Sequence, residues 1–416
     1  MRPGRKTSIV LLALIAAILI LEGWLYFIKG YTSVRTRHAV PERLMNEAAI
    51  PGMKGIRFIA DPLKLKSSKS RLYDIIYKES GLTKARFNRN QINLLSISGG
   101  GANGAYGAGI LCGWTEKGTR PEFDIVTGVS TGALIAPAAF IGSSYDDLIK
   151  GIYTGISDVD IMKQNLIDFF IGGRPSLLDT QPLRGVLRRA VTRKVIDDVA
   201  REHAKGRRLY LATTNLDARR MVMWDMGAIA SYGTPEALEL FRSVMLASAS
   251  IPVAFPPVMF KVEAGGEPYS EMHVDGSVAT QLFGSFLVMG RKDTKGKKTN
   301  IYVIRNGKIA DVPEEVPPKI WDIAGASFST LITWQSYGDI YRFTTLAKYE
   351  RFNFYFTCIP YEFREPRKSE FDLAYMRKLF YRGYRIGQKG DQWIKQIGSV
   401  ITTGEPEGGA EKNKKR

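Results

Sequence analysis

The sequence predicts an α/β fold in which helices cover both faces of a mostly parallel central sheet, a three-layer α/β/α arrangement. Apolar strands are expected at residues 92–97 and 123–129, and each runs into a helical stretch. Further apolar strands recur along the chain at intervals that leave room for helices between them. Strands and helices that alternate at this spacing are typical of a parallel sheet with helical crossovers.

The remaining elements follow from apolar periodicity and from turn residues. The small apolar run at 132–140 predicts a helix buried against the sheet, and residues 143–206 have a helical pattern. Residues 235–249 predict another helix, and residues 321–397 are expected to be mostly helical. Later strands are expected at 207–215, 220–225, 257–262, 268–274, 300–304 and 352–358.

The chain is long enough for a substantial core. Its 416 residues are 44% apolar and 11% aromatic, which indicates a globular protein. The predicted organisation is an N-terminal segment at 1–30, a tether and flank at 31–90, a catalytic core at 91–290, C-terminal strands and helices packed on this core at 291–403, and a tail at 404–416. The tail has few apolar residues and is expected to be disordered.

The charge balance is strongly basic. The chain has 59 Lys and Arg against 41 Asp and Glu, a net charge of +18. Such an excess is typical of a soluble basic surface, of a protein that binds nucleic acid, or of one that meets an anionic membrane. The N-terminus favours the membrane, because basic residues precede an apolar stretch from Ile9 to Ile28 that is long enough to span a bilayer as a helix. Trp24 and Tyr26 near its far end suit the membrane interface.

Three interpretations of the N-terminal segment are consistent with its sequence, and one of them is a helix buried in the core. We expect an uncleaved single helix that anchors the chain, with the bulk of the protein exported. A cleaved signal peptide followed by secretion is the alternative, since the basic start and the first apolar residues also fit one. No clear cleavage site of small residues follows the apolar run.

Cysteine usage points away from metal or disulfide frameworks. Cys112 and Cys358 are the two cysteines, and neither belongs to a CxxC or Cys/His pattern. We therefore expect buried free thiols and no metal site, and we expect no cofactor. A single long-range disulfide stays possible if the domain is exported.

A glycine-rich loop follows the strand at 92–97. Gly99, Gly101 and Gly104 fit the G-x-G-x-x-G pattern of dinucleotide-binding proteins. That interpretation requires an acidic residue at the end of the next strand, which instead ends in Gly128-Val129-Ser130. The physics common to both interpretations is that glycines allow a tight turn and that a helix N-terminus offers N–H donors to an anion. In acyl transfer this anion is the tetrahedral oxyanion.

The second strand-to-helix turn presents a serine. Gly128-x-Ser130-x-Gly132 has the form of a nucleophile elbow, in which small flanking residues permit a strained turn that exposes the hydroxyl. A serine needs a base, and the chain has three histidines. His38 and His203 lie in segments expected at the surface. His273 and Asp275 lie on one predicted strand with their side chains on the same side.

A serine–histidine–aspartate arrangement with both partners two residues apart on one strand is geometrically awkward. Asp275, which is followed by Gly276 at a strand end, is therefore the better partner for Ser130. We expect a local structural role for His273.

These motifs resemble the patatin-like phospholipases, a family with a glycine-rich oxyanion segment, a G-x-S-x-G elbow and an aspartate in a D-G-G or D-G-A motif. The matching segments are Gly99 to Gly104, Gly128 to Gly132, Asp275-Gly276-Ser277 and the run Ala247 to Pro257. Two positions depart from the family pattern. Asn103 stands where a basic residue is common, and Ser277 replaces the usual Gly or Ala.

The resemblance implies a lipid acyl hydrolase with a patatin-like fold and no histidine in its dyad. Ser130 would be the nucleophile and Asp275 the base. Burial should raise the pKa of Asp275, because a carboxylate of ordinary pKa is a weak base at neutral pH. The backbone of Gly99, Gly100, Gly101 and Ala102 would form the oxyanion hole, and Gly104, Gly128, Gly132 and Gly276 would support the motifs.

The implied partners are a phospholipid or other lipid ester as substrate and an anionic membrane surface, with no nucleic acid. The resemblance is to bacterial-type members with an N-terminal membrane segment, so the expected location is the bacterial inner membrane. A catalytically silent module that binds a lipid or a partner protein is the alternative function.

Overall fold

The computed structural model describes residues 21–22, 38–60, 85, 87, 89–161, 163–164, 176, 178–288, 294, 296–310, 313, 315–391 and 393–395. Apart from Leu21 and Glu22, the predicted membrane helix at 1–30 lies outside these residues, and so does the predicted tail at 404–416. Within the described part of the chain, no helix combines the length and the apolar character needed to cross a membrane.

Every strand expected from the sequence is present, together with three further strands of two or three residues, two of which lie in the segment 143–206 that was expected to be helical. The strands are β1 Arg57–Ile59, β2 Gln91–Ile97, β3 Ile125–Val129, β4 Lys163–Gln164, β5 Leu178–Asp179, β6 Arg208–Asn215, β7 Arg220–Asp225, β8 Val258–Ala264, β9 Glu267–Asp275, β10 Lys298–Arg305 and β11 Asn353–Cys358. Every side chain of β2 after Gln91 is buried, as expected for a central strand covered on both faces. Buried and exposed residues alternate along β8, which has one face in solvent.

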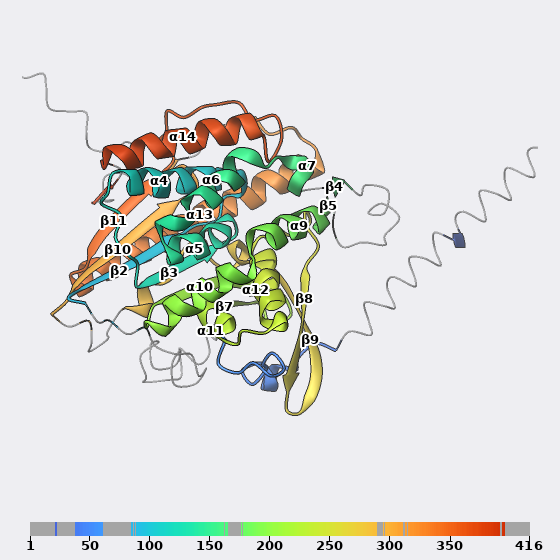
Figure 1. Cartoon of the computed structure of the whole chain (residues 1–416). Helices are drawn as coiled ribbons and strands as arrows, with labels where there is room; N and C mark the ends of the chain where they lie inside the picture. The colour runs from blue at the N-terminus through green and yellow to red at the C-terminus, as the bar shows by residue number, and fades with distance from the viewer. Residues whose placement is uncertain are drawn as a thin grey trace, which may run out of the picture.

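The main sheet has nine strands among the described residues, and its centre is parallel. The neighbouring strands β6, β3, β2, β10 and β11 all run in one direction. On the β6 side the sheet continues with β7, β1, β9 and β8, which pair antiparallel. The hairpin formed by β8 and β9 projects from the body of the molecule (Figure 1). The predicted α/β class with a mostly parallel sheet is therefore confirmed.

The helices fill the intervals between the strands. They are α4 Gly104–Glu116, α5 Thr131–Ile141, α6 Asp146–Gly155, α7 Asp158–Ile161, α9 Gln181–Ala190, α10 Arg193–Ala204, α11 Met226–Ser231, α12 Pro235–Ser248, α13 Ile320–Glu350 and α14 Leu373–Lys389. Short 3₁₀ helices are η1 Glu42–Leu44, η3 Gly101–Asn103, η4 Ser143–Tyr145, η5 Gly276–Val278 and η6 Ser285–Leu287.

Helices lie on both faces of the sheet. On one face, α4, α5, α10, α12 and α14 share a buried apolar cluster with strand residues such as Leu95, Val126 and Leu211. On the other face, the C-terminal half of α13 contributes Ile340 and Phe343 to a second cluster. The first layer is the more extensive of the two among the described residues, and the second depends on a single long helix.

The last helix, α14, lies directly along α4 (Figure 1). Glycines four residues apart on both helices make this possible. On α4, a Cβ added to Gly109 would lie 2.1 Å from the carbonyl oxygen of Phe380, and one added to Gly113 would lie 2.0 Å from that of Tyr384. On α14, a Cβ added to Gly383 would lie 2.5 Å from the carbonyl oxygen of Tyr106, and one added to Gly387 would lie 2.5 Å from that of Ile110. The two backbones therefore touch, and the C-terminal helix is packed against the helix that follows the glycine-rich loop.

The N-terminal flank also joins the sheet. The sequence assigned no defined element to residues 31–90, but β1 pairs with β7 at the edge of the sheet. Its first residue, Arg57, is buried and makes an ion pair with Glu271 of β9, with 2.5 Å between Nη1 and Oε2. The flank is thus fastened to the strand that ends at Asp275.

Candidate active site

Ser130 lies in the turn between β3 and α5. Its φ of 53° and ψ of −125° are unusual for a residue with a side chain, as expected for a strained nucleophile elbow. Its backbone N–H donates to the Ser248 hydroxyl at 3.0 Å, and this hydroxyl donates to the Ala212 carbonyl at 2.7 Å. Ser248, in the run that resembles the family, therefore braces the elbow from the end of α12.

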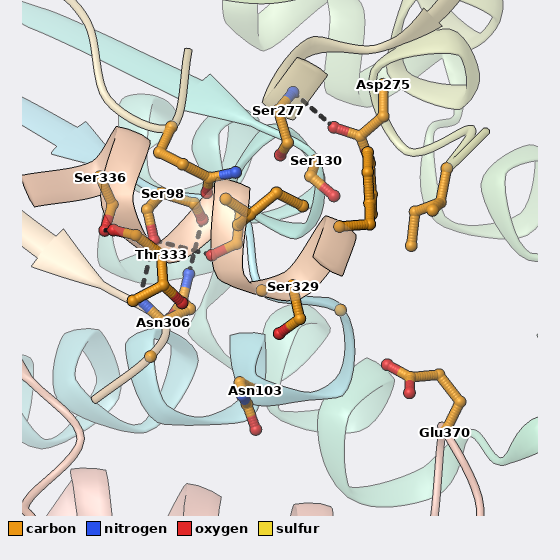
Figure 2. A pocket seen from close by; sticks show the side chains of 18 of the residues that line it. Ser98, Asn103, Ser130, Asp275, Ser277, Asn306, Ser329, Thr333, Ser336 and Glu370 are labelled. Carbon is orange, nitrogen blue, oxygen red and sulfur yellow. Dashed lines mark hydrogen bonds between the residues drawn. The ribbon is translucent and has the colours of Figure 1, made fainter. Parts of the chain in front are cut away.

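The sheet topology brings Asp275 to the same turn. The last residue of β3, Val129, pairs with Ala212 of β6. On the same β6 strand, the next residue, Thr213, pairs with Asp275, because β9 approaches from the opposite direction. The carboxyl ends of β3 and β9 therefore meet head to head, and Figure 2 shows Ser130 beside Asp275.

The Asp275 carboxyl group is 1% exposed and is held by neutral donors. Its Oδ1 accepts a hydrogen bond from the Ser277 amide at 2.7 Å. Its Oδ2 accepts no hydrogen bond of ordinary geometry from the described residues, yet the Ser130 hydroxyl is near enough to lower the pKa by stabilising the charged form. Burial has the larger effect and raises the pKa of Asp275 to about 6. The expected rise in this pKa is confirmed.

The glycine-rich loop lies against the serine. A Cβ on Gly99 would be 3.1 Å from Ser130 Cβ and 2.5 Å from Ser277 Oγ. Gly100 has a φ of 149°, and a Cβ there would lie 2.1 Å from the Asn306 carbonyl oxygen. Gly101 and Ala102 follow in the first turn of η3, where helical N–H groups have no partner within the helix. The loop can thus bring backbone donors close to Ser130 only with glycine at positions 99 to 101.

The four supporting glycines permit close approaches between the same elements. A Cβ added to Gly104 would lie 2.1 Å from Thr131 Oγ1, and one added to Gly128 would lie 2.5 Å from the carbonyl oxygen of Gly132. A Cβ added to Gly132 would lie 2.3 Å from the carbonyl oxygen of Ile97, and one added to Gly276 would lie 2.4 Å from that of Ala212. All ten residues named from the sequence therefore lie in or beside one corner of the sheet.

Asn306 holds the loop in place and was not identified from the sequence. It follows β10, which neighbours β2 in the sheet. Its Nδ2 donates to the Ser98 carbonyl at 2.8 Å, its backbone N–H donates to the Ser98 hydroxyl at 2.9 Å, and its Oδ1 accepts from the Gly107 amide at 3.0 Å. Figure 2 shows Asn306 beside Ser98. An Asn-Gly pair directly after an apolar strand was the available signal.

A cleft of about 660 Å³ opens in front of Ser130 and Asp275. Its walls come largely from the C-terminal third of the chain, to which the sequence assigned no chemistry. Phe328 and Ile332 of α13 form one wall, and the segment around Glu370 and Tyr375 forms another. Tyr375 donates to Asn103 Oδ1 at 2.7 Å, so the residue that replaces the family's basic position is hydrogen-bonded to the C-terminal wall.

His273 is fully buried, and both its ring nitrogens are engaged. Nδ1 is 2.8 Å from Thr213 Oγ1, and Nε2 is 3.1 Å from Glu271 Oε2. Burial lowers the pKa of His273, although Glu271 opposes the shift. Neither nitrogen is available to Ser130. His203, which was expected at the surface, is instead mostly buried, with Nδ1 3.5 Å from Asp225 Oδ1.

Comparison with known proteins agrees with the motifs. Residues 95–282 match the family model for patatin-like phospholipase, a span that contains the glycine-rich loop, Ser130 and Asp275. Among solved structures, VipD from Legionella pneumophila is similar at 13% sequence identity, over 73% of this chain and 67% of VipD, with a TM-score of 0.36. A search of curated proteins found no match. Residues 95–282 are therefore identified as a patatin-like phospholipase domain.

Proposed function

We propose that this protein hydrolyses carboxylic ester bonds of lipids, with Ser130 as the nucleophile and Asp275 as the general base. The family supports lipid esters as the substrate class. The observation that carries the proposal is a buried carboxyl group beside a serine in a strained elbow, with a pKa of about 6. At neutral pH this group is mostly ionised and accepts a proton more readily than an ordinary aspartate.

In the proposed reaction, Asp275 accepts the Ser130 proton while Ser130 Oγ bonds to the ester carbonyl carbon. The amides of Gly100 and Gly101, with that of Ala102, stabilise the oxyanion. Collapse of the tetrahedral intermediate breaks the bond to the leaving alcohol, which takes the proton from Asp275. Water then attacks the acyl-enzyme, Asp275 accepts the water proton, and the proton returns to Ser130 as the fatty acid leaves.

The basic composition and the apolar N-terminal stretch support action at a membrane surface. We infer that residues 1–30 anchor the chain, with the catalytic domain exported, and that the net charge of +18 attracts anionic lipids. Deleting residues 1–30 should release a soluble protein that still cleaves a short-chain ester. If the shortened protein stays with the membrane fraction, the anchor lies elsewhere in the chain.

Covalent labelling with a fluorophosphonate tests the catalytic proposal. Labelling of the full chain in detergent should place the adduct on Ser130, and Ser130→Ala should abolish both labelling and ester hydrolysis. Ser144→Ala, which removes an exposed serine hydroxyl outside the cleft, is the matched control and should label normally. A folded wild-type protein that takes up no label would refute the enzyme, and undiminished labelling of Ser130→Ala would refute the nucleophile.

A further inference from the structure

The outer face of α13 exposes a stripe of large apolar side chains. The stripe consists of six residues that are 51–81% exposed: Ile320, Ile323, Leu331, Trp334, Tyr341 and Tyr349. At 3.6 residues per turn, these six positions fall within an arc of about 80° around the helix. Exposed apolar side chains that gather on one face usually mark an interaction surface.

The other residues on this arc are uncharged. Ser327, Gly338 and Thr345 fill the gaps in the stripe, and all three are exposed. Charged residues begin at its edges, where Arg342, which is ion-paired with Asp339 of the same helix, lies on one side and Lys348 on the other. The outer face is therefore apolar along the axis of the helix, with cations beside it.

The inner face of the same helix faces the candidate active site. In the N-terminal half, Phe328 and Ile332 line the cleft in front of Ser130. In the C-terminal half, Ile340 and Phe343 are buried in the core and fix the helix to the sheet. Because a helix is only about 10 Å across with its side chains, any surface that covers the stripe also lies next to the cleft.

Two other exposed apolar residues border this cleft. Val278, which follows the Asp275 motif, is 36% exposed, and its carbonyl oxygen accepts from Gln335 Nε2 of α13 at 3.4 Å. Val253 is 50% exposed and has a φ of 69°, which is strained for a β-branched residue. Its neighbours Ile251 and Ala254 line the cleft, so the loop holds an apolar side chain outward at the rim.

We propose that the stripe of α13, with Val253 and Val278, docks on an anionic lipid bilayer and thereby places the cleft next to the membrane lipids. This inference rests on the proposed lipid hydrolase function. Trp and Tyr favour the membrane interface, where an apolar ring and a polar group are both accommodated. An amphipathic helix that lies in the interface plane, with basic residues beside its apolar face, binds anionic bilayers by burial and by charge.

Charge favours a bilayer over a second copy of the chain. Each copy has a net charge of +18, so two copies that paired through α13 would bring like net charges together. An anionic bilayer neutralises this charge, whereas self-association adds to the repulsion.

The test compares a lipid ester in vesicles with a soluble short-chain ester, using the full chain. The variant Leu331→Gln/Trp334→Gln should hydrolyse phospholipid in mixed phosphatidylcholine and phosphatidylglycerol vesicles about tenfold more slowly or worse, because two apolar side chains no longer enter the interface. Its hydrolysis of the soluble ester should stay at the wild-type rate. Tyr381→Gln, which alters an exposed aromatic residue on α14, is the matched control and should leave both rates unchanged.

The outcomes separate the docking proposal from the catalytic one. Wild-type protein that hydrolyses neither substrate would refute the proposed function. Equal rates on vesicles for the wild type and the double variant, or equal losses on both substrates, would overturn docking while leaving the hydrolase in place. A wild type that is dimeric in sedimentation and a double variant that is monomeric would assign the stripe to self-association instead.

A second measurement does not depend on the double variant folding. Brominated lipids quench tryptophan fluorescence at the membrane interface, so vesicles that contain them should quench the wild type more than Trp334→Phe. Equal quenching of the two proteins would show that Trp334 does not reach the bilayer and would overturn the proposal.

Discussion

Two carboxyl groups on β9, Glu271 and Asp275, are equally buried but differ in their acidity. Both are 1% exposed, and they lie on the same face of the strand because side chains alternate along it. The pKa of Glu271 is lowered to about 2, whereas that of Asp275 is raised to about 6. Burial alone therefore does not decide the acidity of a carboxyl group in this strand.

The difference lies in the partners. Burial by itself would raise the pKa of Glu271, but hydrogen bonds from His273 and Arg57 and the Arg57 charge outweigh it. Arg57 donates to both Glu271 oxygens, at 2.5 and 3.1 Å. Among the described residues, the groups that lower the pKa of Asp275 are uncharged ones of Ser130 and Ser277. One end of β9 thus ties the N-terminal flank to the sheet, and the other keeps a carboxylate that can gain a proton.

His273 lies on β9 between Glu271 and Asp275, and its hydrogen bonds are consistent with a neutral imidazole ring. The Glu271 carboxylate can only accept, so His273 Nε2 carries the proton and donates to it. Trp224 Nε1 donates to Thr213 Oγ1 at 2.8 Å, which leaves the Thr213 hydroxyl free to donate to His273 Nδ1. The hydrogen bonds that run from Trp224 through Thr213, His273 and Glu271 to Arg57 can therefore all form while the histidine ring is neutral.

The largest expected effect is that of Asp275→Asn. Ester hydrolysis should fall by about 10²–10⁴-fold, since the base is lost. The pKa of Asp275 in the folded state lies above its ordinary value of 3.8, so the ionised group opposes folding, and this penalty grows as the pH rises from about 4 to 6. Asp275→Asn should therefore be at least as stable as the wild type in urea unfolding at pH 8. Substantial activity in this variant would remove Asp275 from the mechanism.

Arg57→Met should have the opposite signature. Of the two partners of Glu271, Arg57 and His273, only His273 remains in this variant, and the carboxylate stays buried. We expect a loss of about 3–5 kcal/mol in the free energy of unfolding. The folded pKa of Glu271 lies below its ordinary value, so its contribution is present above about pH 4.5 and is lost as the pH falls toward 2. Urea unfolding at pH 7 and pH 3 should show the larger loss at pH 7.

A double-mutant cycle sharpens that result. Arg57→Met combined with Glu271→Gln removes both charges and should recover part of the stability lost in either single variant. Strictly additive losses would mean that the ion pair contributes nothing of its own to folding.

The pH dependence of hydrolysis should follow Asp275 and not Glu271. A base with a pKa of about 6 must be ionised, so kcat/KM should rise with pH and be about tenfold higher at pH 7 than at pH 5. The assay needs a soluble ester and a pH range in which unfolding is absent by circular dichroism. A flat profile across this range would show that the carboxyl group does not titrate in the rate-determining step.

The sequence was sufficient to predict most elements of this fold. Local patterns located β7 at residues 220–225 and the hairpin that ends at Asp275, because strand periodicity and turn residues are short-range signals. Contacts between distant segments were not predictable in this way. The four-residue glycine spacing on α4 and α14 is visible in each helix, but nothing local says that the two helices meet.

The candidate site shows the same limit. Ser130, Asp275 and the glycine-rich loop belong to short motifs, and their proximity follows once β3 and β9 are known to end on neighbouring residues of β6. Asn306 has only an Asn-Gly pair as a local signal, and the cleft wall from α13 comes from a segment without a motif. Their roles depend on where the sheet order places β10 and where a long helix crosses the cleft, which sequence periodicity does not specify.

The smallest expected effect is that of His273→Gln, and it decides between the two ends of β9. A glutamine can donate to Glu271 and accept from Thr213, so the loss in the free energy of unfolding should be about 1–2 kcal/mol. Hydrolysis of a soluble ester should stay within about threefold of the wild type, with the same inflection near pH 6, since the ring is neutral and both nitrogens are engaged. A loss as large as that of Asp275→Asn, or disappearance of the inflection, would make the histidine the base and would return Asp275 to a structural role.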